Sequence, residues 1–234
     1  MKNLDGIIEK IDKFIDKKDK IREEALRVSR DIIIHCRKAI QCLHRDARDE
    51  AKVFIGQASG LLSHLYELTK EYPDLYHAGF VENAAQELVE AQCLSNIIAK
   101  EDLPDPDMMQ TTYSSYLMGL CDVVGELRRG SLDFILAGNP TKANEYLTYM
   151  DTIYDAIMRM DYPSALLPIK RKQDMVRGLI EKTKSELAVA SCERRIVDKA
   201  HEFRQLLDEI NHEKNTEEKK KKDEDEDIDL DKIW

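Results

Sequence analysis

The residues from Ala78 to Ala99 read AGFVENAAQELVEAQCLSNIIA, and those from Tyr113 to Leu127 read YSSYLMGLCDVVGEL. Apolar residues recur at intervals of three and four in both stretches, which is the period of one face of an α-helix. Both are poor in charge, although 35% of the chain is charged. Their charged residues are all acidic: Glu82, Glu87, Glu90, Asp122 and Glu126. The two stretches are therefore predicted to be mostly apolar helices that carry carboxylates.

Such carboxylates need a cationic partner. Removing water from an ionised carboxylate costs several kcal/mol unless a cation pairs with it. Neither stretch contains Lys or Arg. The cation is expected to come from another helix or to be a metal ion, and a metal ion would make the cluster a reaction centre.

Composition indicates an all-α protein. The chain has 234 residues, few Gly and Pro, and an apolar pattern of helical period almost throughout. It has no run of 18 apolar residues, and its first residues are charged rather than apolar. The five cysteines are odd in number and lack a CxxC spacing. We therefore expect a soluble cytoplasmic protein whose cysteines are reduced core residues.

The helices are expected at about 5–45, 46–71, 75–100, 107–137 and 141–160, followed by a long pattern to about 211 that Pro168 interrupts. Residues 1–212 would form one helical domain. Residues 213–234 contain ten acidic and six basic residues, which predicts a charged low-complexity tail. Ile228, Leu230, Ile233 and Trp234 in this tail offer a segment that docks on a partner as an alternative to disorder.

Four of the acidic residues form two pairs. Glu87 and Glu90 are three residues apart, and Asp122 and Glu126 are four apart, so each pair shares one helical face. Two packed helices can bring such pairs together. Oxygen donors without His or Cys favour Mg²⁺ or Mn²⁺, and two such ions can align water and a phosphodiester. The spacing predicts phosphoester hydrolysis, while ordinary solvent-exposed pairs are the alternative. Glu82 lies off this face.

Four segments resemble the translin family, and in particular its translin-associated factor X (Trax) branch. They are 28–32 with 43–45, 86–91, 116–127 and 169–172. Trax-type chains keep the acidic residues of the second and third segments, and this chain has all four. Translin-type chains share the fold but lack the full acidic set.

The resemblance implies a seven-helix bundle that assembles into a closed octameric shell with RNA on its inner surface. Glu87, Glu90, Asp122 and Glu126 would be catalytic residues that bind Mg²⁺, with Mn²⁺ as a substitute. The implied activity is a ribonuclease that cleaves short single-stranded RNA, leaving 5′-phosphate and 3′-hydroxyl ends. Single-stranded DNA is a second candidate ligand. The chain lacks the long insertion of eukaryotic Trax proteins, and this compact form is similar to archaeal members and favours a homo-oligomer.

Basic residues near these segments are candidates for phosphate contact, because Arg and Lys bind phosphate directly. They are Arg30, Arg37, Lys38, Arg128, Arg129, Lys170, Arg171, Lys172 and Arg177. The alternative is an ordinary solvated surface with neighbouring acidic partners. The six histidines share no metal-ligand spacing and are interpreted as core or surface residues. Tyr146, Tyr149 and Tyr154 are interpreted as packing or interface residues rather than base-stacking ones.

Three other functions fit the same pattern. A translin-type shell would bind RNA without cleaving it, and its acids would only neutralise buried cations. An all-α nucleoside triphosphate pyrophosphohydrolase would also place acidic pairs on bundle helices, although the spacing of Asp122 and Glu126 fits it less well. An adaptor would use the acids to bind a basic partner.

Overall fold

The structure is a computed structural model that describes residues 3–226, with side chains at 3–211 and 214. Its described residues form seven helices and no strand, which confirms the all-α prediction. The helices are α1 (Leu4–His44), α2 (Arg48–Thr69), α3 (Pro73–Tyr76), α4 (Gly79–Ala99), α5 (Tyr113–Leu136), α6 (Pro140–Ile157) and α7 (Lys170–Glu226). None of these helices is long and apolar enough to cross a membrane.

The chain divides into two compact units, Met1–Lys184 and Ser185–Trp234. The first unit holds α1 to α6 and the start of α7, and it contains the hydrophobic core. The second holds the rest of α7, which continues to Glu226, past its expected end. The predicted domain boundary at 212 stays a prediction. The four apolar residues predicted to dock on a partner, Ile228, Leu230, Ile233 and Trp234, lie outside the described residues.

Three helix starts differ from the sequence-based expectation. The helix expected at 75–100 begins at Gly79 as α4, after the separate short helix α3. α5 begins only at Tyr113, because the segment after α4 contains Pro104 and Pro106 and is not helical. Its cap is Thr112, whose Oγ1 accepts a hydrogen bond from the backbone N–H of Ser115 at 3.1 Å. The last helix begins at Lys170, after a non-helical segment that includes Pro168. The broad helix assignment is confirmed, whereas these starts were predicted too early.

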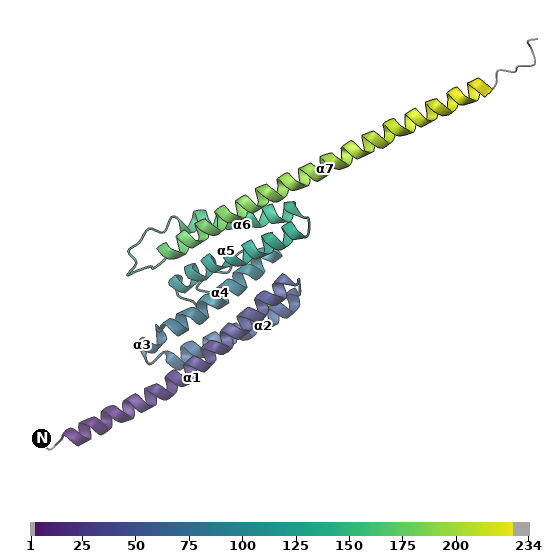
Figure 1. The fold of residues 1–234 in the computed structure, drawn as a ribbon. Coiled ribbons are helices and arrows are strands. Elements are labelled where there is room, and N and C mark those ends of the chain that lie inside the picture. The colour runs from purple at the N-terminus through teal and green to yellow at the C-terminus, as the bar shows by residue number, and fades with distance from the viewer. Residues whose placement is uncertain (1–2, 227–234) are drawn as a thin grey trace, which may run out of the picture. The chain divides into compact units, whose positions relative to one another are not determined.

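The first unit is built from helices that pack in sequence. α1 contacts α2 and α4, α4 contacts α5, and α5 contacts α6 (Figure 1). The interfaces are filled by side chains that are almost fully buried: Ile32, Leu62, Leu65, Leu88, Leu94, Leu127 and Met150. The start of α7 is joined to the end of α6 by Gln173, whose Nε2 donates to the carbonyl oxygens of Ile157 and Met160. This packing holds α4, α5 and the first turns of α7 in one unit.

α4 and α5 approach closely at Gly119. A Cβ placed on Gly119 would lie 2.6 Å from the carbonyl oxygen of Gln86 and 2.7 Å from Cβ of Val89. Real side chains do not tolerate such distances, so only glycine allows this separation of the two backbones. Because Gln86 and Val89 flank Glu87 on the α4 side, Gly119 fixes how near the acidic residues of α5 come to those of α4.

Gly119→Ala should therefore lower the free energy of unfolding by about 1–3 kcal/mol, the usual cost of overpacking a core. Gly125→Ala is the matched control on the same helix, since a Cβ there meets nothing within 4 Å. It should leave stability unchanged or raise it by up to about 1 kcal/mol, because alanine favours a helix over glycine. Denaturant unfolding of both variants measures the difference, and equal effects would contradict a close contact at Gly119.

Candidate active site

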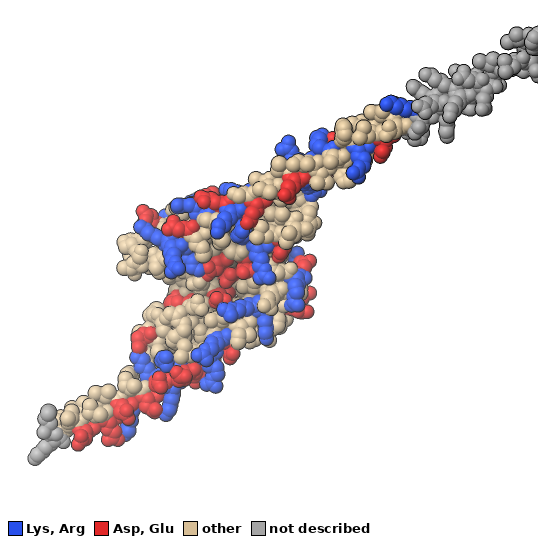
Figure 2. Space-filling model, in the orientation of Figure 1, with Lys and Arg blue, Asp and Glu red and all other residues tan. Residues whose placement is uncertain are grey.

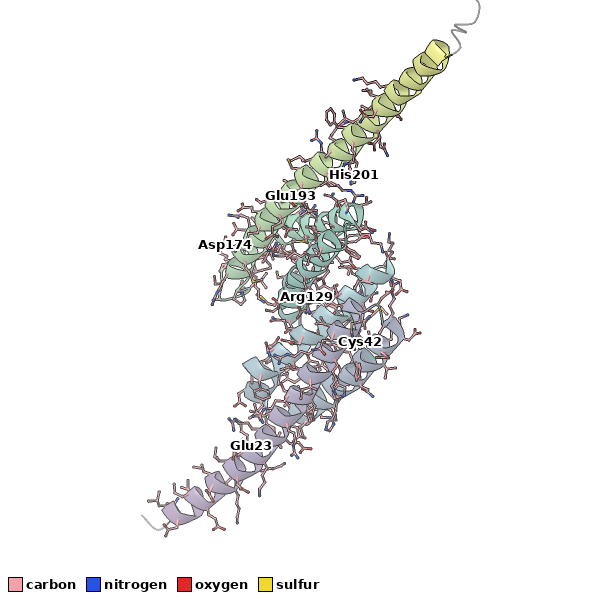
Figure 3. The ribbon with its side chains drawn as sticks, turned by 45° about the vertical axis from the view of Figure 1, so that its right-hand side comes forward. Glu23, Cys42, Arg129, Asp174, Glu193 and His201 are labelled. Atoms are coloured by element: carbon pink, nitrogen blue, oxygen red, sulfur yellow. The ribbon has the colours of Figure 1, made fainter. Side chains whose placement is uncertain are left out.

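The four predicted carboxylates come from neighbouring turns of two adjacent helices. Glu87 and Glu90 lie on α4, and Asp122 and Glu126 lie on α5. All four are partly buried, and the side chains of Asp122 and Glu126 retain 20% and 24% exposure. We call these four residues the acidic cluster. It belongs to the first unit, where Arg129, labelled in Figure 3, marks the α5 side.

The acidic cluster is electrostatically coupled. Burial is the largest cause of the raised pKa of Glu90, which reaches about 8, and the negative charges of Asp122, Glu87 and Glu126 raise it further. The pKa of Glu87 is also raised, mainly by burial. Lys172 opposes both shifts. The carboxylates are therefore close enough to repel one another, and the cations around them do not fully compensate this charge.

Two cations at the cluster come from other helices, which is one of the two sources expected from the sequence. Lys172 of α7 forms an ion pair with Asp122, whose other carboxylate oxygen accepts a hydrogen bond from Gln86 Nε2. Arg37 of α1 lowers the pKa of Glu87 through its charge. These contacts hold Asp122 in place and leave Glu90 as the carboxylate that burial and repulsion perturb most.

Glu126 has a partner of its own. Its Oε2 lies 2.5 Å from Nε2 of His44, at the end of α1, and 3.9 Å from Nη1 of Arg129. The hydrogen bond to His44 is the main reason why the pKa of Glu126 lies below its usual value. The His44 side chain is only 11% exposed. Glu126 is thus held ionised in the same cluster in which Glu90 is driven toward its neutral form.

The oxygen donors of the acidic cluster could bind a divalent cation only if several of them reached the same ion. Within residues 3–211, no three His, Cys, Asp or Glu side chains stand close enough to hold a metal ion. The donor set nevertheless fits a hard cation, because it consists of carboxylate oxygens whose mutual repulsion a cation would relieve. The ammonium of Lys172 occupies one oxygen of Asp122. Metal binding by Glu87, Glu90, Asp122 and Glu126 therefore stays a prediction.

The nine basic residues predicted to contact RNA have different surroundings, and their contact with RNA stays a prediction. Arg37, Arg129 and Lys172 interact with the acidic cluster. The other six have these contacts or exposure: Arg128 donates to Thr183, Arg177 donates to Tyr154, Lys38 lies over Phe54, Lys170 lies 3.6 Å from Asp161, and Arg30 and Arg171 are exposed. On the face drawn in Figure 2, basic and acidic side chains are interspersed over the elements.

Sequence reasoning missed two members of the site, His44 and Gln86. His44 was interpreted as a core or surface residue, whereas it pairs with Glu126 from 82 positions away. Gln86 was not singled out, although it donates to Asp122. Both residues lie in segments that resemble the translin family, and that resemblance was the only available signal. No spacing rule connects α1 with α5, so these contacts required the structure.

The fold and the cluster together define an all-α bundle with acidic pairs on two facing helices. The translin family model matches residues 20–222, and the chain belongs to this family. An uncharacterized protein of Methanocaldococcus jannaschii is 33% identical over 178 residues, which is 74% of this chain and 78% of that protein.

Solved structures show the same fold. AfC3PO is 33% identical, with a TM-score of 0.72, and the match covers 80% of this chain and 98% of that one. A complex of AfC3PO with duplex RNA gives 32% identity and the same TM-score, with 80% and 97% covered. The apo form of NeC3PO is 24% identical with a TM-score of 0.67 over 81% and 98% of the chains, a likeness of fold alone. The seven-helix translin-type bundle is thus confirmed.

Proposed function

We propose that this chain is a Trax-type, Mg²⁺-dependent endoribonuclease of the cytoplasm. The observation that carries the proposal is the acidic cluster itself. It contains four carboxylates on facing helices, and burial, followed by the repulsion of the other three, raises the pKa of Glu90 to about 8. Buried carboxylates with strongly perturbed pKa values are typical of functional sites. A set of carboxylate oxygens fits the binding of a hard divalent cation.

The residues of the cluster have distinct roles in this proposal. Glu87, Glu90, Asp122 and Glu126 would hold Mg²⁺, or Mn²⁺ in its place. The bound ion supplies charge stabilisation at the phosphate and lowers the pKa of water. His44 keeps Glu126 ionised and oriented. Lys172 and Gln86 orient Asp122, and one of the two glutamates of α4 accepts the proton of the attacking water.

RNA is the proposed substrate. The structure of AfC3PO with duplex RNA supports RNA as the ligand class for a chain that is 32% identical to it. Single-stranded RNA remains our proposal for the cleaved form, with single-stranded DNA as a second ligand. Arg37, Arg129 and Lys172 interact with carboxylates of the cluster, and we propose these three as the residues that contact phosphates there. Assembly of several copies into a closed homo-octamer would surround the strand.

A second candidate function is a non-catalytic RNA-binding shell. The ion pair of Lys172 with Asp122 favours it, because in this structure a protein ammonium already neutralises one of the four acids. In that case the acidic residues would neutralise cations of the helical bundle, and the bound RNA would not be cleaved.

Incubation of a labelled single-stranded RNA with the purified protein separates the two functions. We expect cleavage in Mg²⁺, with 5′-phosphate and 3′-hydroxyl ends, and intact RNA in EDTA. Binding without cleavage under both conditions would establish the carrier instead. A parallel reaction with free nucleoside triphosphates tests the pyrophosphohydrolase alternative, for which pyrophosphate release with intact RNA is the diagnostic result.

A further inference from the structure

A cavity adjoins the acidic cluster at His44. Its volume is about 300 Å³, and it is lined by the end of α1, the start of α2, the end of α4, the C-terminal half of α5 and the first turns of α6. Its lining includes His44, Arg48, Gly130, Phe134, Tyr146 and Tyr149. All of them belong to the first unit. A cavity of this volume is at the small end of ligand sites and suits one ring system.

His44 connects this cavity to the acidic cluster. Its ring lines the cavity, while its Nε2 lies 2.5 Å from Oε2 of Glu126. Gly130, another wall residue, follows Glu126 by one helical turn on the same face of α5. Residues four apart on a helix are neighbours, with Cβ positions about 5–6 Å apart. The wall of the cavity therefore adjoins the acidic cluster at His44 and Gly130.

One wall of the cavity is aromatic. The rings of Phe134 and Tyr146 meet edge to face at 5.1 Å, and Tyr149 follows at 6.3 Å from Tyr146. A Cβ on Gly130 would lie 2.6 Å from Cε2 of Tyr146, so glycine lets this ring lie directly on α5. Tyr146 and Tyr149 do pack against the core, as the sequence predicted. Both remain partly exposed, which leaves ring surface toward the cavity.

The charges of the cavity are balanced. Arg48 pairs with Asp46 at 2.8 Å, and Lys100 pairs with Glu145 at 2.6 Å. Lys142 lies 5.2 Å above the ring of Phe134. With its cations already paired or placed over a ring, the cavity is poorly suited to an isolated anion. A flat, uncharged ring with polar edges fits it better, and a nucleobase has these properties.

We propose that this cavity binds one unpaired base of the RNA strand that lies on the acidic cluster. The inference rests on the proposed function, because the cluster places the strand. The base stacks on the aromatic wall, chiefly on Tyr149, and its edges meet the polar side chains around it. Stacking on aromatic residues is the general means by which proteins hold single-stranded bases. Binding of this base would fix which phosphate reaches the cluster.

The test uses equilibrium binding in EDTA, so that it does not depend on cleavage. The probes are fluorescent oligoribonucleotides six nucleotides long, either intact or with one abasic nucleotide at each position in turn. For the unmodified protein, the abasic change at one position should weaken binding about tenfold, and the others should have little effect. Tyr149→Ala should weaken binding of the intact probe about tenfold and should abolish the extra loss at that position.

Three further variants complete the design. Tyr149→Phe keeps the ring and should bind like the unmodified protein, whereas Tyr149→Leu keeps apolar volume without a π face and should behave like Tyr149→Ala. Tyr162→Ala removes an exposed tyrosine outside the cavity and should have no effect. An abasic profile that is flat, or that is the same in Tyr149→Ala, would overturn the proposal. If the protein shows the expected binding profile in EDTA but does not cleave RNA in Mg²⁺, the proposed nuclease activity is wrong and the base-binding site still stands.

Discussion

Asp122→Asn is expected to reduce the Mg²⁺-dependent cleavage rate of single-stranded RNA by roughly a thousandfold. The substitution keeps the shape of the side chain and removes the negative charge through which Asp122 would hold the cation. A loss of this size corresponds to about 4 kcal/mol in the activation free energy. Rates measured at saturating RNA and Mg²⁺ provide the number, and binding of the same RNA in EDTA should change little.

Glu82→Gln is the matched control for this loss. Glu82 is a carboxylate of the same helix α4 as Glu87 and Glu90, but it turns to the start of α5, where its Oε2 accepts from Thr112 Oγ1 at 2.7 Å. Glutamine retains an oxygen for that hydrogen bond, so cleavage should stay within about twofold of the unmodified rate. Equal losses in Asp122→Asn and Glu82→Gln would show that the effect reflects charge or stability in general and not the acidic cluster.

The sequence was sufficient to predict the helices and the acidic pairs, for a physical reason. Helical period and charge depletion are local properties, and the pairs Glu87–Glu90 and Asp122–Glu126 each lie within one turn. The close contact of Gly119 with Gln86, which brings the pairs together, depends on the packing of two helices and is not encoded in either pattern alone.

Contacts between distant segments account for what could not be predicted. Glu126 contacts His44 at the end of α1, and Asp122 contacts Lys172 at the start of α7, so both partners come from helices that are distant in sequence. Lys172 was expected to contact phosphate, but in the structure its ammonium forms an ion pair with Asp122. The start of α5 at Tyr113 was missed because the acidic turn before it resembles a helix cap, while its prolines keep it irregular.

The second large effect concerns stability and pH. The pKa of Glu90 is raised from an ordinary value of 4.5 to about 8 in the folded protein, first by burial and then by the charges of Asp122, Glu87 and Glu126. Between these pH values the folded state holds a proton that the unfolded state has released. The free energy of unfolding must therefore fall as pH rises from about 4.5 to about 8, and above that range Glu90 adds no further dependence.

Glu90→Gln should remove this dependence, because glutamine stays neutral at every pH. We expect the variant to be more stable than the unmodified protein by about 4 kcal/mol at pH 8, and by about 1 kcal/mol or less at pH 5, where Glu90 is already protonated when folded. Denaturant unfolding at the two pH values in EDTA measures the difference. Saturating Mg²⁺ should stabilise the unmodified protein at pH 8 more than the variant, because a bound cation favours the ionised carboxylate. A variant that is equally destabilised at both pH values would mean that the Glu90 side chain contributes through packing. Its carboxylate would then have no role in binding a cation.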